Sequence, residues 1–197
     1  MTQQNEESAS GAPLLKYVSP DPLKAFGQCE ILSNVAVPLI TVGDESDITK
    51  LPVTITNLPF CMVMSQDCDL ERDFDQYKKD KGTALRHILL CELLHTDDQI
   101  TSVSNGMGIK TRDLKEQLPR DPHLRHGFLE KLDGKTPELL ADFRMVYGIQ
   151  PNFLYYQMEH NTSQRLIRLN SPYKEYFSQR FYFYLNRVAL QDRYTSV

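Results

Sequence analysis

The apolar residues of this 197-residue chain fall into short runs of strand length that are separated by polar or proline-containing turns. Val53 and Ile55 alternate with threonines, a pattern typical of a half-buried strand, and residues 60–64 form a continuous apolar run that fits a buried central strand. An Asn-Leu-Pro turn at 57–59 separates these two runs. The pattern predicts strands over 28–42, 53–57, 60–66, 86–95, 153–158 and 165–169, with the last two paired in a hairpin.

The clearest predicted helix covers residues 171–190 near the C-terminus. Ser171 is a suitable N-cap and Pro172 fits the first helical position. An apolar stripe at helical spacing, which should face the sheet, consists of Tyr173, Tyr176, Phe177, Phe181, Tyr184 and Val188. We therefore expect a β-rich α+β fold, with a bent antiparallel sheet or a small barrel and a C-terminal helix over one side.

The length of the chain indicates one domain. Residues 1–12 are small and polar, which predicts a disordered tail before a single β-rich domain over 13–197. Residues 105–110 form a glycine-rich turn. Helix-forming residues follow over 111–132, but two prolines interrupt them, so we expect short helical pieces in an insertion around 111–145.

Composition excludes several classes of protein. No run approaches the ~20 apolar residues of a membrane helix, and the polar N-terminus lacks the pattern of a signal peptide. The net charge of −4 and pI of about 5.7 argue against a general nucleic-acid binder. Without an export signal, we interpret the cysteines as reduced thiols in a cytoplasmic protein; they are Cys29, Cys61, Cys68 and Cys91.

A polar cluster follows the apolar run 60–64 and is the main candidate site. It consists of Ser65, Gln66, Asp67, Cys68 and Asp69. At strand spacing the two aspartates share one face and the cysteine takes the other. Two neighbouring carboxylates repel each other unless a cation or hydrogen-bond donors lie between them. The cluster therefore either caps local backbone groups in a turn or forms a binding site.

Residues of these types could support three kinds of chemistry. A catalytic Cys–His pair is disfavoured because acidic neighbours oppose the thiolate form of Cys68. Cys61, Cys68, Cys91 and His95 supply zinc-ligand types, but no Cys-x-x-Cys spacing is present. Magnesium at the two aspartates would generally need a partner phosphate as well. We assign no cofactor and no metal.

An aromatic run at 181–185 lies beside Arg180. Exposed aromatic rings with arginine can stack nucleic-acid bases. A helix that packs aromatic side chains on a sheet explains the run better, because the residues fit one helical face.

The segment 64–70, with its Ser-Gln-x-Cys-Asp string, resembles a group of poorly characterised bacterial proteins. Residues 169–181 are similar to the closing helix of that group. The resemblance implies an SH3-like barrel distantly related to PemK/MazF-type toxins, in a mobile-element or phage-defence setting. Those ribonucleases use a basic groove, whereas the corresponding segment here is acidic, which favours a protein partner over RNA cleavage.

The sequence leads to one functional hypothesis with two alternatives. We expect a non-catalytic binding or regulatory module in a bacterial or phage-defence, toxin-like setting, in which 65–69 and Arg180 contact a ligand or a protein partner. Nucleic acid is the alternative partner. A toxin-like ribonuclease or metal-assisted nuclease using Asp67, Asp69 and Arg180 is the first alternative, and a zinc-stabilised structural protein is the second.

Overall fold

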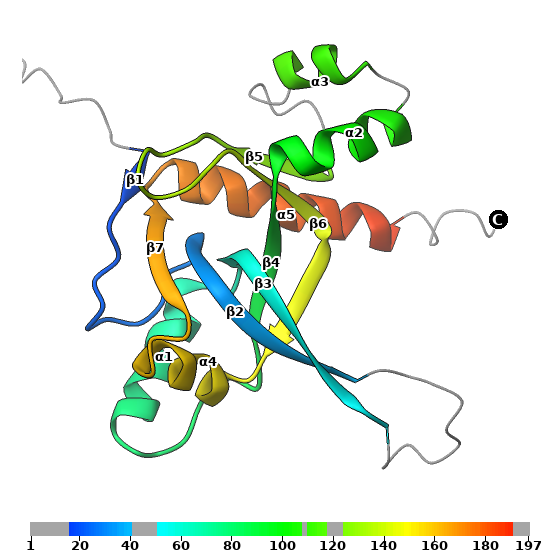
Figure 1. Ribbon diagram of the computed structural model, residues 1–197. Helices are drawn as coiled ribbons and strands as arrows, with labels where there is room; N and C mark the ends of the chain where they lie inside the picture. The colour runs from blue at the N-terminus through cyan, green and yellow to red at the C-terminus, as the bar shows by residue number, and fades with distance from the viewer. Residues whose placement is uncertain (1–15, 41–50, 108–109, 118–123, 191–197) are drawn as a thin grey trace, which may run out of the picture.

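An open, seven-stranded antiparallel sheet forms the centre of the computed structural model (Figure 1), which describes residues 16–40, 51–107, 110–117 and 124–190. The strands are β1 (Tyr17–Val18), β2 (Glu30–Ile40), β3 (Val53–Val63), β4 (Ile88–His95), β5 (His126–Leu129), β6 (Leu139–Ile149) and β7 (Gln164–Leu169). The helices are α1 (Asp67–Lys78), α2 (Thr96–Met107), α3 (Thr111–Gln117), α4 (Pro151–Glu159) and α5 (Tyr173–Leu190). None of these helices is long and apolar enough to cross a membrane.

The strands follow the order β1-β7-β2-β3-β4-β6-β5, and neighbours pair antiparallel. The two outer strands do not pair with each other, so the sheet does not close. The predicted β-rich α+β class with a C-terminal helix is therefore confirmed as an open sheet. A closed, SH3-like barrel is not what the chain forms.

Both faces of the central strands are buried, which explains the continuous apolar run in β3. Met62 and Met64 lie in one core with Phe177 and Phe181 of α5. Cys61 and Val63 belong to the opposite core, where side chains of α1 and α4 cover the sheet. Successive side chains of this run thus enter two different cores. For this reason the run 60–64 shows no alternation of apolar and polar residues.

The predicted turn at 57–59 is wrong, because β3 runs without a break from Val53 to Val63. Pro59 lacks an N–H, and it lies between Leu58 and Phe60, which both pair with β2. On β2, Asn34 adopts a left-handed backbone conformation (φ 55°) between the residues paired with those two. The β2–β3 hairpin therefore accommodates Pro59 by leaving Pro59 and Asn34 out of the pairing.

The predicted strand at 153–158 is also wrong, since these residues belong to helix α4. Pro151 occupies the first turn of this helix, where its fixed φ is suitable and its missing N–H costs nothing. Leu154 and Tyr155 bury one face of the helix in the core beneath the sheet. The expected hairpin is absent for the same reason, and β7 pairs with β1 and β2 instead.

Several smaller boundaries also differ from prediction. Of the turn expected at 105–110, residues 105–107 lie within α2, and the helical stretch expected at 111–132 contains strand β5. Helix α3 is one of the predicted short helical pieces, and α5 begins at Tyr173 rather than Ser171. Residues 1–12 and both prolines of the 111–132 segment lie outside the described residues.

Candidate functional site

The polar cluster 65–69 forms the junction between β3 and α1, not the tip of a strand. Ser65 accepts a hydrogen bond from the backbone N–H of Leu89 on β4, with an N–O distance of 2.9 Å. Gln66 has an extended backbone immediately before α1, and Asp67 is the first helical residue. Because the helix starts here, the strand-spacing argument that placed both aspartates on one face is wrong.

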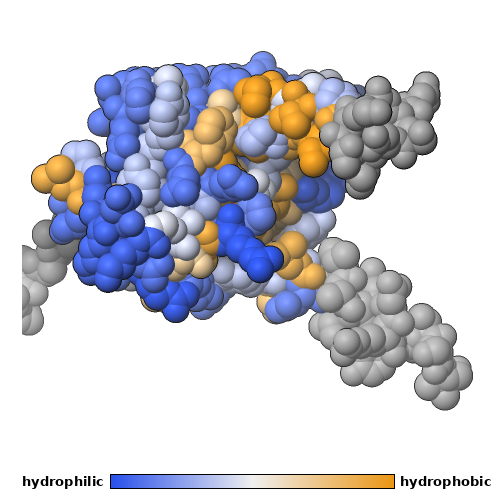
Figure 2. Space-filling view, turned by 90° about the horizontal axis from the view of Figure 1, so that it is seen from below, coloured by the Kyte–Doolittle hydropathy of each residue, from blue (hydrophilic) through white to orange (hydrophobic). Residues whose placement is uncertain are grey.

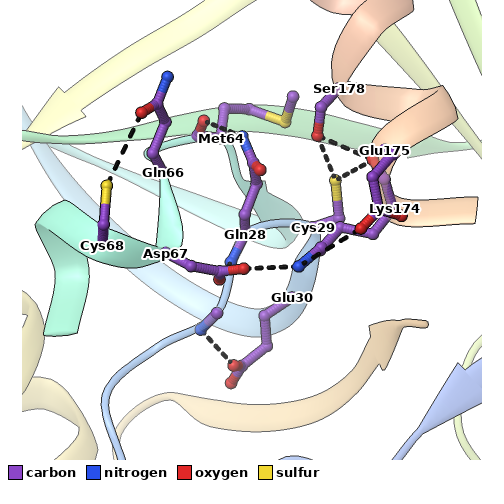
Figure 3. Close-up of polar contacts among 11 residues, drawn as sticks. Gln28, Cys29, Glu30, Met64, Gln66, Asp67, Cys68, Lys174, Glu175 and Ser178 are labelled. Atoms are coloured by element: carbon purple, nitrogen blue, oxygen red, sulfur yellow. Dashed lines mark hydrogen bonds and ion pairs between the residues drawn. The ribbon is translucent and has the colours of Figure 1, made fainter. Parts of the chain in front are cut away.

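Asp67 ties three separate parts of the fold together (Figure 3). Its Oδ1 accepts a hydrogen bond from the backbone N–H of Gln28 at 2.7 Å, and its Oδ2 accepts one from the Lys174 ammonium at 2.6 Å. The ion pair is only partly exposed. Asp67 thereby joins the start of α1 to the segment before β2 and to the first turn of α5.

Cys29 lies next to this ion pair but is buried and structural. Its backbone is left-handed (φ 60°), and its Sγ lies 3.3 Å from Ser178 Oγ and 3.6 Å from the Lys174 carbonyl oxygen. Burial is the largest cause that raises the pKa of this thiol, to about 12. A thiol that stays protonated at neutral pH is a poor nucleophile.

Cys68 and Asp69 make contacts of their own, separate from the Asp67 ion pair. Cys68 is exposed, and its Sγ lies 3.8 Å from Gln66 Oε1 (Figure 3). Asp69 forms an exposed ion pair of 3.3 Å with Arg72, one turn along α1. The acid–thiol–acid sequence therefore does not converge on one point in space.

Arg180 lies apart from the cluster, on α5 against strand β5. Its Nη2 donates a 2.7 Å hydrogen bond to the carbonyl oxygen of His126, and the residue is 8% exposed. Its guanidinium lies 5.8 Å from the ring centre of Tyr176. The predicted site residues thus separate into a helix junction at 65–69 and a helix–strand contact at Arg180.

The zinc alternative has no ligand set in the described part of the chain. Cys61 and Cys91 belong to the two different cores, on opposite faces of the sheet. His95 is exposed at the end of β4. Across the residues that the structure describes, no three His, Cys, Asp or Glu side chains are grouped so that they could hold a metal ion.

The aromatic side chains of α5 divide between core and surface. Phe177 and Phe181 are buried against the sheet, as predicted. Tyr173 and Tyr176 are 38% and 53% exposed, so the expected apolar stripe covers the sheet only in part.

A groove between α1 and α4 was missed by the sequence reasoning, because α4 was predicted as a strand. We call it the α1–α4 groove, and its volume is about 480 Å³. It is lined by Pro22, Lys24 and Phe26, by Phe74, Tyr77 and Lys78 of α1, by Tyr155, Met158 and Glu159 of α4, and by Asn161, Ser163, Gln164 and Arg165. Pro151, which lies in the first turn of α4, is the sequence signal that could have predicted this helix.

Stacked rings form the floor of the α1–α4 groove. The Phe26 and Tyr155 rings lie parallel, 5.5 Å apart, and the Tyr77 ring lies 4.4 Å from Tyr155. Tyr155 donates a 2.8 Å hydrogen bond to buried Asp73, and burial together with this contact raises the pKa of the tyrosine. Tyr155 is thus held by ring contacts on two sides and by a hydrogen bond at its hydroxyl.

A buried ion pair holds one wall of the groove. Arg165 pairs with Glu30, which is fully buried, and donates hydrogen bonds to the carbonyl oxygens of Lys24 and Ala25. Because its guanidinium is occupied, Arg165 shapes the groove without offering a free charge. Lys24 and Lys78, with 79% and 55% of their side chains exposed, provide the accessible positive charge.

Comparison of the chain with protein-family models, with curated proteins and with solved structures found no match.

Proposed function

We propose that this protein is a non-catalytic binding module whose α1–α4 groove receives an acidic protein segment carrying an apolar side chain. The observation that carries the proposal is an aromatic groove with two exposed lysines on its rim. Ligand sites are typically concave and apolar, with a few polar groups that set orientation. The bacterial or phage-defence setting rests on the family resemblance and is part of the proposal.

The charge of the rim favours an acidic partner. Each lysine has one exposed carboxylate partner: Asp21 lies 3.7 Å from Lys24, and Glu159, which also lines the groove, lies 3.8 Å from Lys78. Exposed ion pairs of this kind contribute little, so each lysine can exchange its partner for a bound carboxylate. Tyr77, Phe74 and Met158 supply the apolar surface for one side chain.

A protein segment fits the groove better than nucleic acid does. Base stacking needs a free ring face, but Phe26 and Tyr155 are stacked on each other and only 4% and 3% exposed. Cluster 65–69 favours neither partner, since its two carboxylates pair with Lys174 and Arg72. The nuclease alternative gains no support, because Asp67 and Arg180 make separate contacts.

The test uses a fluorescent pentapeptide, amidated at its C-terminus, with a central Phe or Leu flanked by Asp and Glu. Anisotropy should show saturable binding that weakens with salt. The double variant Lys24→Glu/Lys78→Glu should bind at least about tenfold more weakly, a loss of about 1.4 kcal/mol. Tyr77→Ala should weaken binding similarly, because it removes apolar contact.

Lys79→Glu is the matched control. Lys79 follows Lys78 on the chain but pairs with Asp75 and does not line the groove. This variant should bind the acidic peptide within about twofold of the unaltered protein, since exposed charges outside a contact contribute little. Equal loss in the control, or tighter binding of a Lys-flanked peptide or a single-stranded oligonucleotide, would overturn the proposal.

A further inference from the structure

Strand β6 contains a large bulge at the far end of the sheet from the α1–α4 groove. Cys91 of β4 pairs with Val146 of β6, whereas Leu93 pairs with Ala141. Glu92 therefore faces the stretch 142–145 alone. A bulge turns side chains away from the regular pleat and commonly accompanies a functional site.

Asp142, at the base of this bulge, fixes two arginines. Its Oδ1 accepts a 3.0 Å hydrogen bond from Arg125 Nε, and its Oδ2 accepts from Nη2 of both Arg125 and Arg144. The Asp142 side chain is 12% exposed, whereas those of Arg125 and Arg144 are 35% and 54% exposed. Within the described residues, Nη1 of neither arginine makes a hydrogen bond, so both guanidiniums retain donors for a ligand.

These arginines open onto a groove of about 520 Å³, which we call the bulge groove. Glu92 also lines it, and the Tyr147 hydroxyl donates a 2.9 Å hydrogen bond that fixes this carboxylate. The remaining lining consists of the polar residues Gln99 and His126 and of the apolar residues Leu94, Val103, Leu140 and Met145.

The charges of the bulge groove cancel. Arg125 and Arg144 contribute two positive charges, and Asp142 and Glu92 contribute two negative charges. A phosphate dianion would meet two carboxylates, and a simple cation would meet two guanidiniums. A ligand with one charge of each sign can pair its negative group with the guanidiniums and its positive group with the Glu92 carboxylate.

We propose that the bulge groove binds a free α-amino acid with an apolar side chain. The ligand carboxylate accepts hydrogen bonds from Arg125 and Arg144, whose planar guanidiniums suit a carboxylate. The ligand ammonium donates to Glu92, and its side chain packs against Leu94 and Met145. This site is separate from the α1–α4 groove, so the inference does not depend on the proposed function.

Calorimetric titration of the full chain with L-leucine tests the inference. L-leucine should bind, whereas N-acetyl-L-leucine, which lacks the ammonium, and isoamylamine, which lacks the carboxylate, should each bind at least about tenfold more weakly. Inorganic phosphate should not compete. No detectable L-leucine binding at about 10 mM, or equal binding of N-acetyl-L-leucine or phosphate, would overturn it.

Two variants test the recognition of the ligand ammonium and of the ligand carboxylate separately. Glu92→Gln can keep its contact with Tyr147, so it should lower the affinity for L-leucine about tenfold and leave that for N-acetyl-L-leucine unchanged. Arg144→Met should weaken both ligands. Arg112→Met, on exposed α3 outside the groove, is the control and should change neither; loss in this control would contradict the site.

Discussion

Asp67 shows how one side chain can connect three elements. Its carboxylate accepts hydrogen bonds from the Gln28 backbone and from Lys174, and the pair is shielded in part from water. Hydrogen bonds to a charged group contribute more to stability than neutral ones do. The contacts of Asp67 therefore give the Ser-Gln-x-Cys-Asp segment a structural role, as the junction between β3 and α1.

Asp67→Ala should lower the free energy of unfolding by about 1–2 kcal/mol, because it leaves the Gln28 N–H and the Lys174 ammonium without their acceptor. Urea denaturation followed by circular dichroism measures the change. Asp69→Ala is the control, since its exposed pair with Arg72 should contribute less than about 1 kcal/mol. Equal effects for the two variants would contradict the role given to Asp67.

Cys29 predicts a specific loss of stability at alkaline pH. Burial raises the pKa of its thiol from the usual 9.0 to about 12 in the folded protein. The unfolded chain therefore releases this proton first, so the contribution of the thiol is complete below pH 9 and falls as the pH rises toward 12. The decline is at most about 1.4 kcal/mol per pH unit.

The measurement compares the unaltered protein with Cys29→Ala by urea unfolding at pH 7 and through pH 9–11. The difference in unfolding free energy should be constant below pH 9 and shrink above it. Tyr17 and Tyr147, whose pKa values burial also raises to about 12, cancel in this difference. A difference that does not change with pH would show that Cys29 is accessible in the folded state.

Part of the candidate site could be predicted at the residue level. Two carboxylates so close in sequence favour cations or hydrogen-bond donors nearby, and the structure provides Lys174 for Asp67 and Arg72 for Asp69. Lys174 itself could not be identified, because it lies 107 residues away in sequence. Which distant residue completes such a pair depends on the tertiary fold.

At the scale of elements, Gly127 sets the distance between β5 and α5. A methyl group at this position would lie 2.6 Å from Cε2 of Phe177 and 3.1 Å from Cζ of Phe143. Both rings belong to the core between the sheet and α5. The helix can pack this closely only because the strand carries no side chain here.

Gly127→Ala should therefore destabilise the protein by about 1–3 kcal/mol, the usual cost of overpacking a core. Thermal unfolding should show a lower Tm. Gly148→Ala on β6 is the matched control, since its methyl would meet His87 at an ordinary 3.4 Å. A Gly127→Ala protein as stable as the control would show that α5 packs less closely than described.

Helices and strands were predictable where their context was unambiguous. Strands β4 and β7 match the predicted runs, and α5 carries the expected helical pattern. Helix α4 was missed because a short apolar run fits a strand and a buried helix equally well. The α1–α4 groove could not be predicted without this helix.

The whole molecule is a sheet covered by helices on both faces at its centre, with one hairpin that extends beyond them (Figure 1). Ile40, Val53 and Ile55 on this hairpin are more than 60% exposed. Seen from below, the surface is mostly hydrophilic, with hydrophobic residues gathered toward the side where the hairpin lies (Figure 2).

The sequence predicts the class of this fold but not whether the sheet is open. Alternation and run length report how many faces of a strand are buried, which is why β3 was recognisable. Closure depends on whether β1 and β5 meet, and nothing in Tyr17 or His126 reveals that. The order of the strands depends on pairs that are distant in sequence, such as β2 with β7, and local patterns do not report such pairs.

The most direct test of the central claim is to map where an acidic peptide binds, by two-dimensional NMR of the labelled full chain. The α1–α4 groove and the 65–69 junction lie at opposite ends of α1, about 15 Å apart at 1.5 Å per residue. The proposed function predicts perturbed amide signals at Tyr77, Lys78 and Met158. Perturbation confined to 65–69, with the groove unchanged, would contradict it.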